Sequence, residues 1–185
     1  MASKETIKAL RSQIEDNRVK SVSGQWFIPQ SKVREIFSYD KIDLSVAELT
    51  TSVHDRLRLA ESIQQGGTIT FAILVWMREE DSIVSFRNHE CLDNQLPLNE
   101  TRAQEISPEF GLTFAREYQW QFQPYYFTEG MYNHHRVITD GIIFPFVGEE
   151  HIAEGGFGKI SELSIPDSMQ EFPGTTVTTV RLHLS

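Results

Sequence analysis

Apolar positions recur at helical spacing through the first half of the chain. Between residues 3 and 16, three of them lie at i, i+3 and i+7 among charged neighbours: Ile7, Leu10 and Ile14. This spacing lines one face of a helix and predicts an exposed or docking helix. A second run begins near Ser45 and ends at Gly66-Gly67, because glycine favours a helix C-terminus. We expect it to be the main core helix, with apolar positions Leu49, Val53, Leu57, Ala60 and Ile63.

Shorter apolar segments lie between and after these runs. Residues 26–29, Trp-Phe-Ile-Pro, form an apolar anchor before Ser31, which is the predicted N-cap of a short helix that contains Val33, Ile36 and Phe37. Residues 68–77 are apolar almost throughout, so periodicity does not separate a buried strand from a buried helix, and we favour the helix. Pro97 indicates a turn over residues 93–98, and the polar residues 99–108 predict a loop.

Aromatic residues are concentrated between residues 114 and 127: Phe114, Tyr118, Trp120, Phe122, Tyr125, Tyr126 and Phe127. Stacking on nucleic-acid bases needs interleaved basic residues, and Arg116 is the only one in this stretch. We therefore interpret the cluster as packing between segments, and we expect a later sheet to dock on it. After Asp140 apolar residues lead into a glycine cluster, which places a boundary near residues 130–140.

Together these patterns predict an α+β fold with two regions. Residues 1–128 form a mainly helical, non-catalytic region, and residues 140–185 form a small antiparallel sheet. The expected strands are 142–147, 159–165 and the alternating stretch Thr176 to Leu182.

Net charge and composition limit the classes of molecule that this chain is expected to bind. The formal net charge is -9 and the pI is near 5.1, so we expect neither nucleic acid nor an anionic membrane as a partner. The longest apolar run, Ile69 to Met77, has about half the roughly 20 residues that span a bilayer, and no secretory signal is recognisable near Met1. The single cysteine, Cys91, suits a buried thiol in a reducing compartment. We expect a cytoplasmic protein with a protein partner.

One motif has a chemical mechanism: the glycine cluster in residues 151–163, His-Ile-Ala-Glu-Gly-Gly-Phe-Gly-Lys-Ile-Ser-Glu-Leu. Protein kinases place G-x-G-x-x-G-x-V between two antiparallel strands, where glycines let backbone N–H groups approach the ATP phosphates. In register, Ala153, Gly155 and Gly158 take the three glycine positions, and Ile160 takes the apolar position that packs on adenine. A plain hairpin whose tight turn needs glycine explains the same residues.

The sequence around the motif resembles kinase-like proteins of filamentous ascomycete fungi. Phe144-Pro145-Phe146, the glycine cluster and residues 160–165 look like the start of their kinase domain, its first strand, loop and second strand. Three upstream segments resemble, in the same order, landmarks of the non-catalytic region that precedes it: Phe71–Val75, Asp93–Leu98 and Gln119–Pro124. The resemblance implies a truncated kinase N-lobe and a nucleotide-binding hairpin made of Ile152, Ala153, Glu154, Gly155, Gly156, Phe157, Gly158 and Ile160.

Departures from the kinase pattern predict that this chain alone is inactive. Ala153 replaces a glycine, and no lysine follows Lys159 to hold the α and β phosphates, since Val180 stands at that position with Arg181 beside it. Neither the catalytic loop nor the metal-binding D-F-G motif follows, so we expect no catalytic residue, no metal site and weak or absent ATP binding. His134-His135 does not change this, because adjacent side chains rarely bind one ion.

Three interpretations follow. The chain is the front part of a Ser/Thr protein kinase, in which case the coding DNA beyond Ser185 should encode the missing motifs. Alternatively, it is a non-catalytic interaction or regulatory module with a degenerate kinase-like hairpin. In the third, a helical domain unrelated to kinases has a chance glycine turn. If residues 142–147 and 159–165 are not strands that flank the glycine loop, the kinase interpretation fails.

Overall fold

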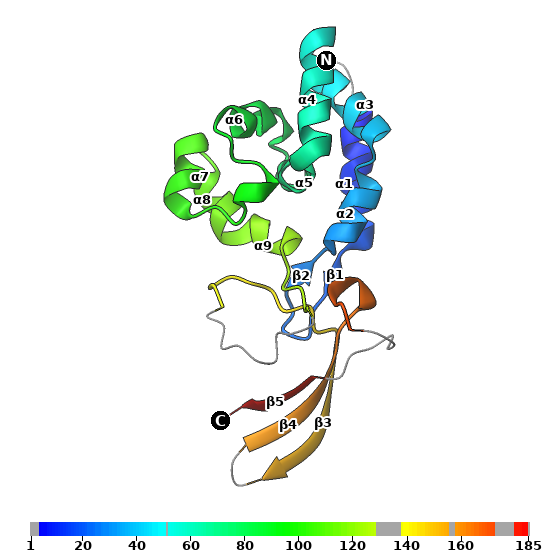
Figure 1. The fold of residues 1–185 in the computed structure, drawn as a ribbon, viewed down its shortest axis with the longest axis vertical. Coiled ribbons are helices and arrows are strands. Elements are labelled where there is room, and N and C mark those ends of the chain that lie inside the picture. The colour runs from blue at the N-terminus through cyan, green and yellow to red at the C-terminus, as the bar shows by residue number, and fades with distance from the viewer. Residues whose placement is uncertain (1–3, 51, 129–137, 156–157, 173–179, 185) are drawn as a thin grey trace.

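The computed structural model describes residues 4–50, 52–128, 138–155, 158–172 and 180–184. Figure 1 shows the helices gathered in one body, the short β1–β2 ribbon beneath them, and a second sheet that extends away from the helices. The predicted α+β fold, mainly helical first and antiparallel later, is confirmed.

The α-helices are α1 (Glu5–Asn17), α2 (Gln30–Ile36), α3 (Tyr39–Leu49), α4 (Val53–Gly66), α5 (Thr68–Met77), α6 (Ile83–Asn88), α7 (Glu100–Ile106), α8 (Gly111–Thr113) and α9 (Gln119–Phe122). Short 3₁₀ turns are η1 (Glu80–Ser82), η2 (Asp93–Gln95) and η5 (Asp167–Met169), and η3 (Phe114–Tyr118) is a π-helical turn that joins α8 to α9. The strands are β1 (Val19–Lys20), β2 (Trp26–Phe27), β3 (Gly148–Gly155), β4 (Gly158–Ser164) and β5 (Val180–Leu184).

Helix α5 is the centre of the main core. Its residues from Thr68 to Val75 are all buried, and the helix packs against α1, α2 and α4. The choice of helix over strand for this apolar run is confirmed. A helix that is apolar on all sides needs neighbours on all sides, which explains why the other helices surround it.

A distant carboxylate caps the N-terminus of α5, which has no cap of its own. The Asp93 carboxylate in η2 accepts hydrogen bonds from the backbone N–H groups of Ile69 (3.0 Å) and Thr70 (2.8 Å) and from the Thr70 hydroxyl (2.9 Å). These contacts satisfy amide groups that the helix itself leaves without acceptors, and a negative charge suits this end of the helix dipole.

Helix α1 belongs to the same core. Its three predicted face residues are buried: Ile7, Leu10 and Ile14. The predicted helix is therefore confirmed, and it is docked rather than exposed.

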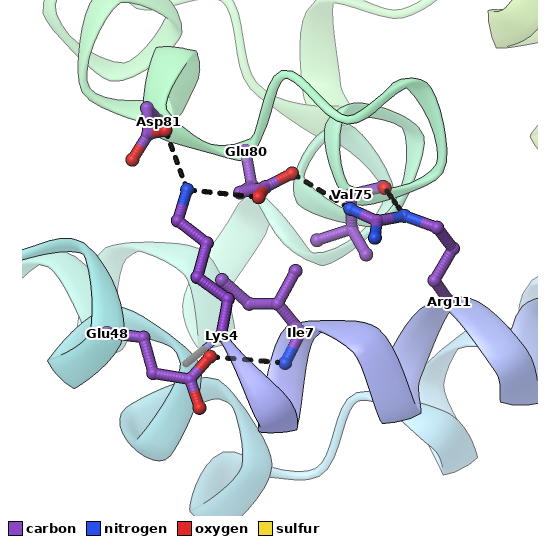
Figure 2. Close-up of polar contacts among 7 residues, drawn as sticks. All are labelled: Lys4, Ile7, Arg11, Glu48, Val75, Glu80 and Asp81. Carbon is purple, nitrogen blue, oxygen red and sulfur yellow. Dashed lines mark hydrogen bonds and ion pairs between the residues drawn. The ribbon is translucent and has the colours of Figure 1, made fainter. Parts of the chain in front are cut away.

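Polar contacts hold α1 against η1 and the end of α5, as Figure 2 shows. Buried Glu80 accepts from Lys4 (3.1 Å) and from Arg11 (3.1 Å), and the Nε of Arg11 donates to the backbone carbonyl of Val75 (2.8 Å). Because Glu80 is only 6% exposed and has two cationic partners, its charge is compensated within the protein. Glu48 of α3 caps the N-terminus of α1, since it accepts the N–H of Ile7 (3.3 Å).

Three local predictions are wrong. Ser31 lies inside α2, whose N-cap is Pro29, because the extended backbone at the proline starts the helix earlier than expected.

The single helix expected from Ser45 is interrupted: Thr50 is extended, and Ser52 starts α4 by accepting the N–H of Asp55 (3.4 Å). This break changes which positions face the core. Leu59, Ala60 and Ile63 are buried, whereas two expected core residues are exposed: Val53 and Leu57.

The third error is the loop expected over residues 99–108, which contains α7. Asn99 is its N-cap and accepts the N–H of Arg102 (2.8 Å), and Ala103 and Ile106 are buried. The cap signal was present in the sequence, but only two apolar positions mark the buried face of so short a helix.

The ion pair between Asp43 and Arg56 links α3 to α4 and makes stability depend on pH. Hydrogen bonding to Arg56 holds the pKa of Asp43 below its usual value, although burial opposes this effect. The stabilisation is therefore present above the ordinary aspartate pKa and is lost as the pH falls through the lowered value. We expect Asp43→Asn to lower the urea midpoint at about pH 7 and to have little effect at about pH 2. Asp16→Asn is the control for the charge change, and a deficit in Asp43→Asn that stays constant with pH would contradict this role.

Candidate functional site

The glycine cluster forms a tight antiparallel hairpin. Strands β3 and β4 pair in the register Gly155 with Gly158, and Ala153 with Ile160, with an irregularity between His151 and Ala153. The two glycines thus face each other across the last pair before the connection. The predicted strand over residues 159–165 is confirmed by β4, which ends at Ser164.

The other expected strand, residues 142–147, is wrong, because β3 begins only at Gly148. Ile143 and Pro145 are buried instead. Proline lacks a backbone N–H and cannot donate to a strand ladder, and the carbonyl of Ile143 accepts from the N–H of Tyr125 (2.9 Å) rather than from a strand. Residues 142–147 thus pack beside the start of the sheet, and we call them the support segment.

The aromatic cluster of residues 114–127 packs against the support segment. Ring centroids lie 5.2 Å apart for Tyr125 and Phe144, and 5.8 Å apart for Phe127 and Phe146. Beside them a second apolar cluster joins residues from both parts of the chain: Phe27, Trp120, Ile143, Ile165 and Met169. The interpretation of the aromatics as packing between segments is confirmed for these residues.

The predicted nucleotide-binding residues lie along the hairpin. Ile152 and Ala153 are exposed on β3, and Ile160 on β4 is half-buried. Glu154, Gly155 and Gly158 lie on the strands next to the connection, whereas Gly156 and Phe157 lie outside the described residues. The structure therefore brings the described members together on one hairpin.

This hairpin does not fit the phosphates of ATP. Between residues 145 and 172 the sequence has six carboxylates and Lys159 as the sole lysine or arginine. Glu149 and Glu150 on β3 are exposed, and Glu150 pairs across the sheet with Glu162. The described side chains of β3 from Glu149 to Ala153 all face solvent, so no described element forms an opposite wall for adenine. Like charges repel a polyanion, and solvent weakens the remaining contacts.

A third strand continues the sheet in chain order. β5 pairs antiparallel with β4, with Leu163 opposite Val180, so the sheet order is β3-β4-β5. The expected strand from Thr176 to Leu182 is confirmed from Val180 onward, and residues 173–179 lie outside the described part.

Hydrogen bonds inside the helical part connect the elements that contain the three upstream landmark segments. Asp93 of the second landmark caps α5, which contains the first. Buried Gln119 of the third landmark accepts the N–H of Leu98 (2.8 Å) and donates to its carbonyl (2.9 Å) and to the carbonyl of Ala115 (2.7 Å). These residues hold the core together, and they lie in segments remote from the hairpin in sequence.

Sequence reasoning missed a groove beside α9. Two adjacent hollows, of about 400 and 310 Å³, share Arg116, Trp120 and Gly141 in their walls. We call the pair the Trp groove, because Trp26 of β2 lines the second hollow together with Trp120. The available signal was the pair of tryptophans, each of which was read as an apolar packing residue.

No helix in the described part of the chain is long and apolar enough to cross a membrane. Within those same residues, no group of three or more His, Cys, Asp or Glu side chains is arranged to hold a metal ion. Comparisons of the chain with protein-family models, with curated proteins and with solved structures find no match.

Proposed function

We propose that residues 148–184 are the opening three strands of a protein-kinase-like domain of the Ser/Thr type, and that this chain acts through protein contacts rather than by phosphoryl transfer. The observation that carries the proposal is the sheet order β3-β4-β5, with Gly155 opposite Gly158 at the end of the first hairpin. A glycine-rich hairpin followed by a third antiparallel strand is the order in which a kinase domain begins.

The residues present argue against phosphoryl transfer. A kinase supplies little besides positioning and charge neutralisation, through a strand lysine, a catalytic aspartate and bound Mg²⁺. No lysine follows Lys159 in the sequence, and the surroundings of the hairpin are acidic. ATP binding needs a cationic side chain that holds the phosphates and an apolar pocket that covers the adenine. The described residues supply neither.

The helical part supports the protein-contact role. The ion pairs of buried Glu80 and the Asp93 cap hold the helices around α5, and such satisfied polar contacts favour an ordered surface for binding. It lies next to the support segment of the sheet, through Phe27 and Trp120. A partner bound to the helical part is therefore placed close to the start of the kinase-like strands.

Thermal unfolding with Mg-ATP tests the proposal. A ligand raises stability by RT ln(1 + [L]/Kd), so a bound nucleotide at a hundred times its Kd would add about 2.7 kcal/mol. We expect millimolar Mg-ATP to shift the melting temperature by less than about 1 °C. Ala153→Gly, which restores the first glycine, should behave in the same way, because the carboxylates remain.

The matched control is Gly155→Val, which fills the hairpin where a phosphate would approach. A clear stabilisation by Mg-ATP that this variant abolishes would contradict the proposal, since it would locate nucleotide binding at the hairpin.

A further inference from the structure

Strand β3 is the edge strand of its sheet. It pairs with β4 on one side, and no described strand lies on its other side. Figure 1 shows β3 as the outer strand of a sheet that extends away from the helices. In an antiparallel pair, alternate residues direct their backbone N–H and C=O groups away from the neighbouring strand. The outer side of β3 therefore presents a row of donors and acceptors to which a further strand can bind.

A bulge sets the length of this edge. The register of β3 with β4 shifts between His151 and Ala153, so Ile152 lies opposite no residue of β4, and its side chain is 45% exposed. A bulge bends the strand and interrupts a regular ladder. An added strand can therefore pair regularly with residues 148–151 and make an apolar contact with Ile152. This edge suits a short segment.

The exposed charges of this edge are negative. Glu149 and Glu150 are both exposed, they point to opposite faces of the sheet, and neither has an ion pair within the described residues. Across the sheet, Arg181 of β5 lies opposite Glu162 of β4, which in turn lies opposite Glu150. Opposite charges on neighbouring strands stabilise a sheet, and like charges destabilise it. The row lacks a cation at its outer end, beyond Glu150.

These carboxylates discriminate between classes of added strand. A second copy of β3, paired antiparallel over residues 148–151, would place Glu149 of one copy opposite Glu150 of the other, so like charges oppose self-association. An acidic segment meets the same repulsion. A basic strand gains the backbone hydrogen bonds together with charge pairs on both faces. The edge therefore favours a basic partner over a second copy.

We propose that the outer edge of β3 binds a short, extended, basic segment of a partner protein, which adds a fourth strand to the sheet β3-β4-β5. Backbone hydrogen bonds to residues 148–151 hold the segment, and lysine or arginine side chains beside Glu149 and Glu150 select it. This inference rests on the proposed role in protein contacts and names the class of partner.

The test is a titration of the ¹⁵N-labelled protein with a blocked octapeptide of alternating threonine and lysine. It is done at about 50 mM salt, because higher salt screens exposed charge pairs. We expect the backbone amide resonances of residues 148–152 to shift in a saturable way. Hydrogen exchange should become slower at alternate residues of this segment, since those amides gain an acceptor. Saturable shifts confined to the helices would overturn the proposed site.

Two further peptides separate charge from strand formation. Alternating threonine and glutamate reverses the charge, and alternating proline and lysine keeps the charge but lacks half of the backbone N–H donors. Each should bind at least about fivefold more weakly than the threonine–lysine peptide. Equal binding of the glutamate peptide would overturn the basic partner. Equal binding of the proline peptide would show charge attraction without an added strand and would equally overturn the proposal.

Two variants with the same change of charge complete the test. Glu150→Lys should weaken binding of the threonine–lysine peptide by at least about fivefold, because repulsion replaces attraction at the edge. Asp16→Lys, at an exposed position of α1, should bind as the unaltered protein does. Equal binding by the two variants, or no saturable shift in the unaltered protein, would contradict the proposal. Because nucleotide plays no part in this titration, its failure is distinct from a failure of the Mg-ATP test.

Discussion

Replacing Gly111 by alanine is expected to destabilise the protein by about 3 kcal/mol, the upper part of the range for overpacking in a well-packed interior. A Cβ at this buried position would lie 2.1 Å from the carbonyl oxygen of Ala103 and 2.7 Å from the backbone nitrogen of Gln104. Both are backbone atoms of α7, so no side chain can rotate to make room. The variant must separate α7 from α8 and disturb the packing of Ala103. Urea unfolding of the full chain measures the loss.

Gly66→Ala is the matched control, because it adds the same methyl group at the last residue of α4, where no atom beyond the neighbouring residues and the helix's own backbone lies within 4 Å of the new Cβ. Alanine is a better helix former than glycine, so this variant should be neutral or more stable by up to about 1 kcal/mol. Equal stabilities of the two variants would mean that the close approach of α7 and α8 is not a constraint on the fold.

Asp93→Ala is expected to cost about 2–3 kcal/mol, more than loss of an ordinary helix cap. The side chain accepts three hydrogen bonds at the start of α5, from Ile69 N–H, Thr70 N–H and the Thr70 hydroxyl. Its removal leaves these donors unpaired in the part of the core where Ile69 and Thr70 are buried. Guanidinium chloride unfolding, followed by circular dichroism, measures the effect.

Asp93→Asn separates hydrogen bonding from charge. An amide keeps one acceptor oxygen, so this variant should retain part of the stability and lie between Asp93→Ala and the unaltered protein. Asp16→Ala controls for loss of an exposed aspartate and should have an effect within about 0.5 kcal/mol. If Asp93→Ala were as mild as this control, the capping role of Asp93 would be wrong.

Asp93 and Gln119 show what two of the upstream segments do in the fold. Asp93 and Gln119 are the residues of the second and third landmarks that make buried polar contacts, and both contacts stabilise the helical part. Such residues are constrained by folding, because an unpaired polar group in a core is costly. These residues therefore relate to the folding of the helical region, and the proposal of a kinase-like domain start depends on the sheet β3-β4-β5 and its glycine hairpin.

The sequence alone determined the features that depend on local periodicity and backbone preference. The spacing of Ile7, Leu10 and Ile14 identified α1, and Gly155 with Gly158 located the hairpin. The apolar run after Gly67 marked a buried element, and only the structure decided that it is the helix α5. For α1 and the hairpin, neighbouring residues carry the whole signal, because a helix face or a tight turn is built from a few consecutive positions. The acidic balance around the hairpin was equally readable from composition.

Only the tertiary structure decided which contacts join distant residues. The cap on α5 comes from Asp93, 23 residues after Thr70. Ile143 packs with Trp120, and Pro145 is buried, where their apolar character had suggested a strand. The Trp groove likewise exists because Trp26, Trp120 and Gly141 meet from three separate segments. Long-range caps, burial and hollows depend on how the chain packs, and no local pattern encodes that packing.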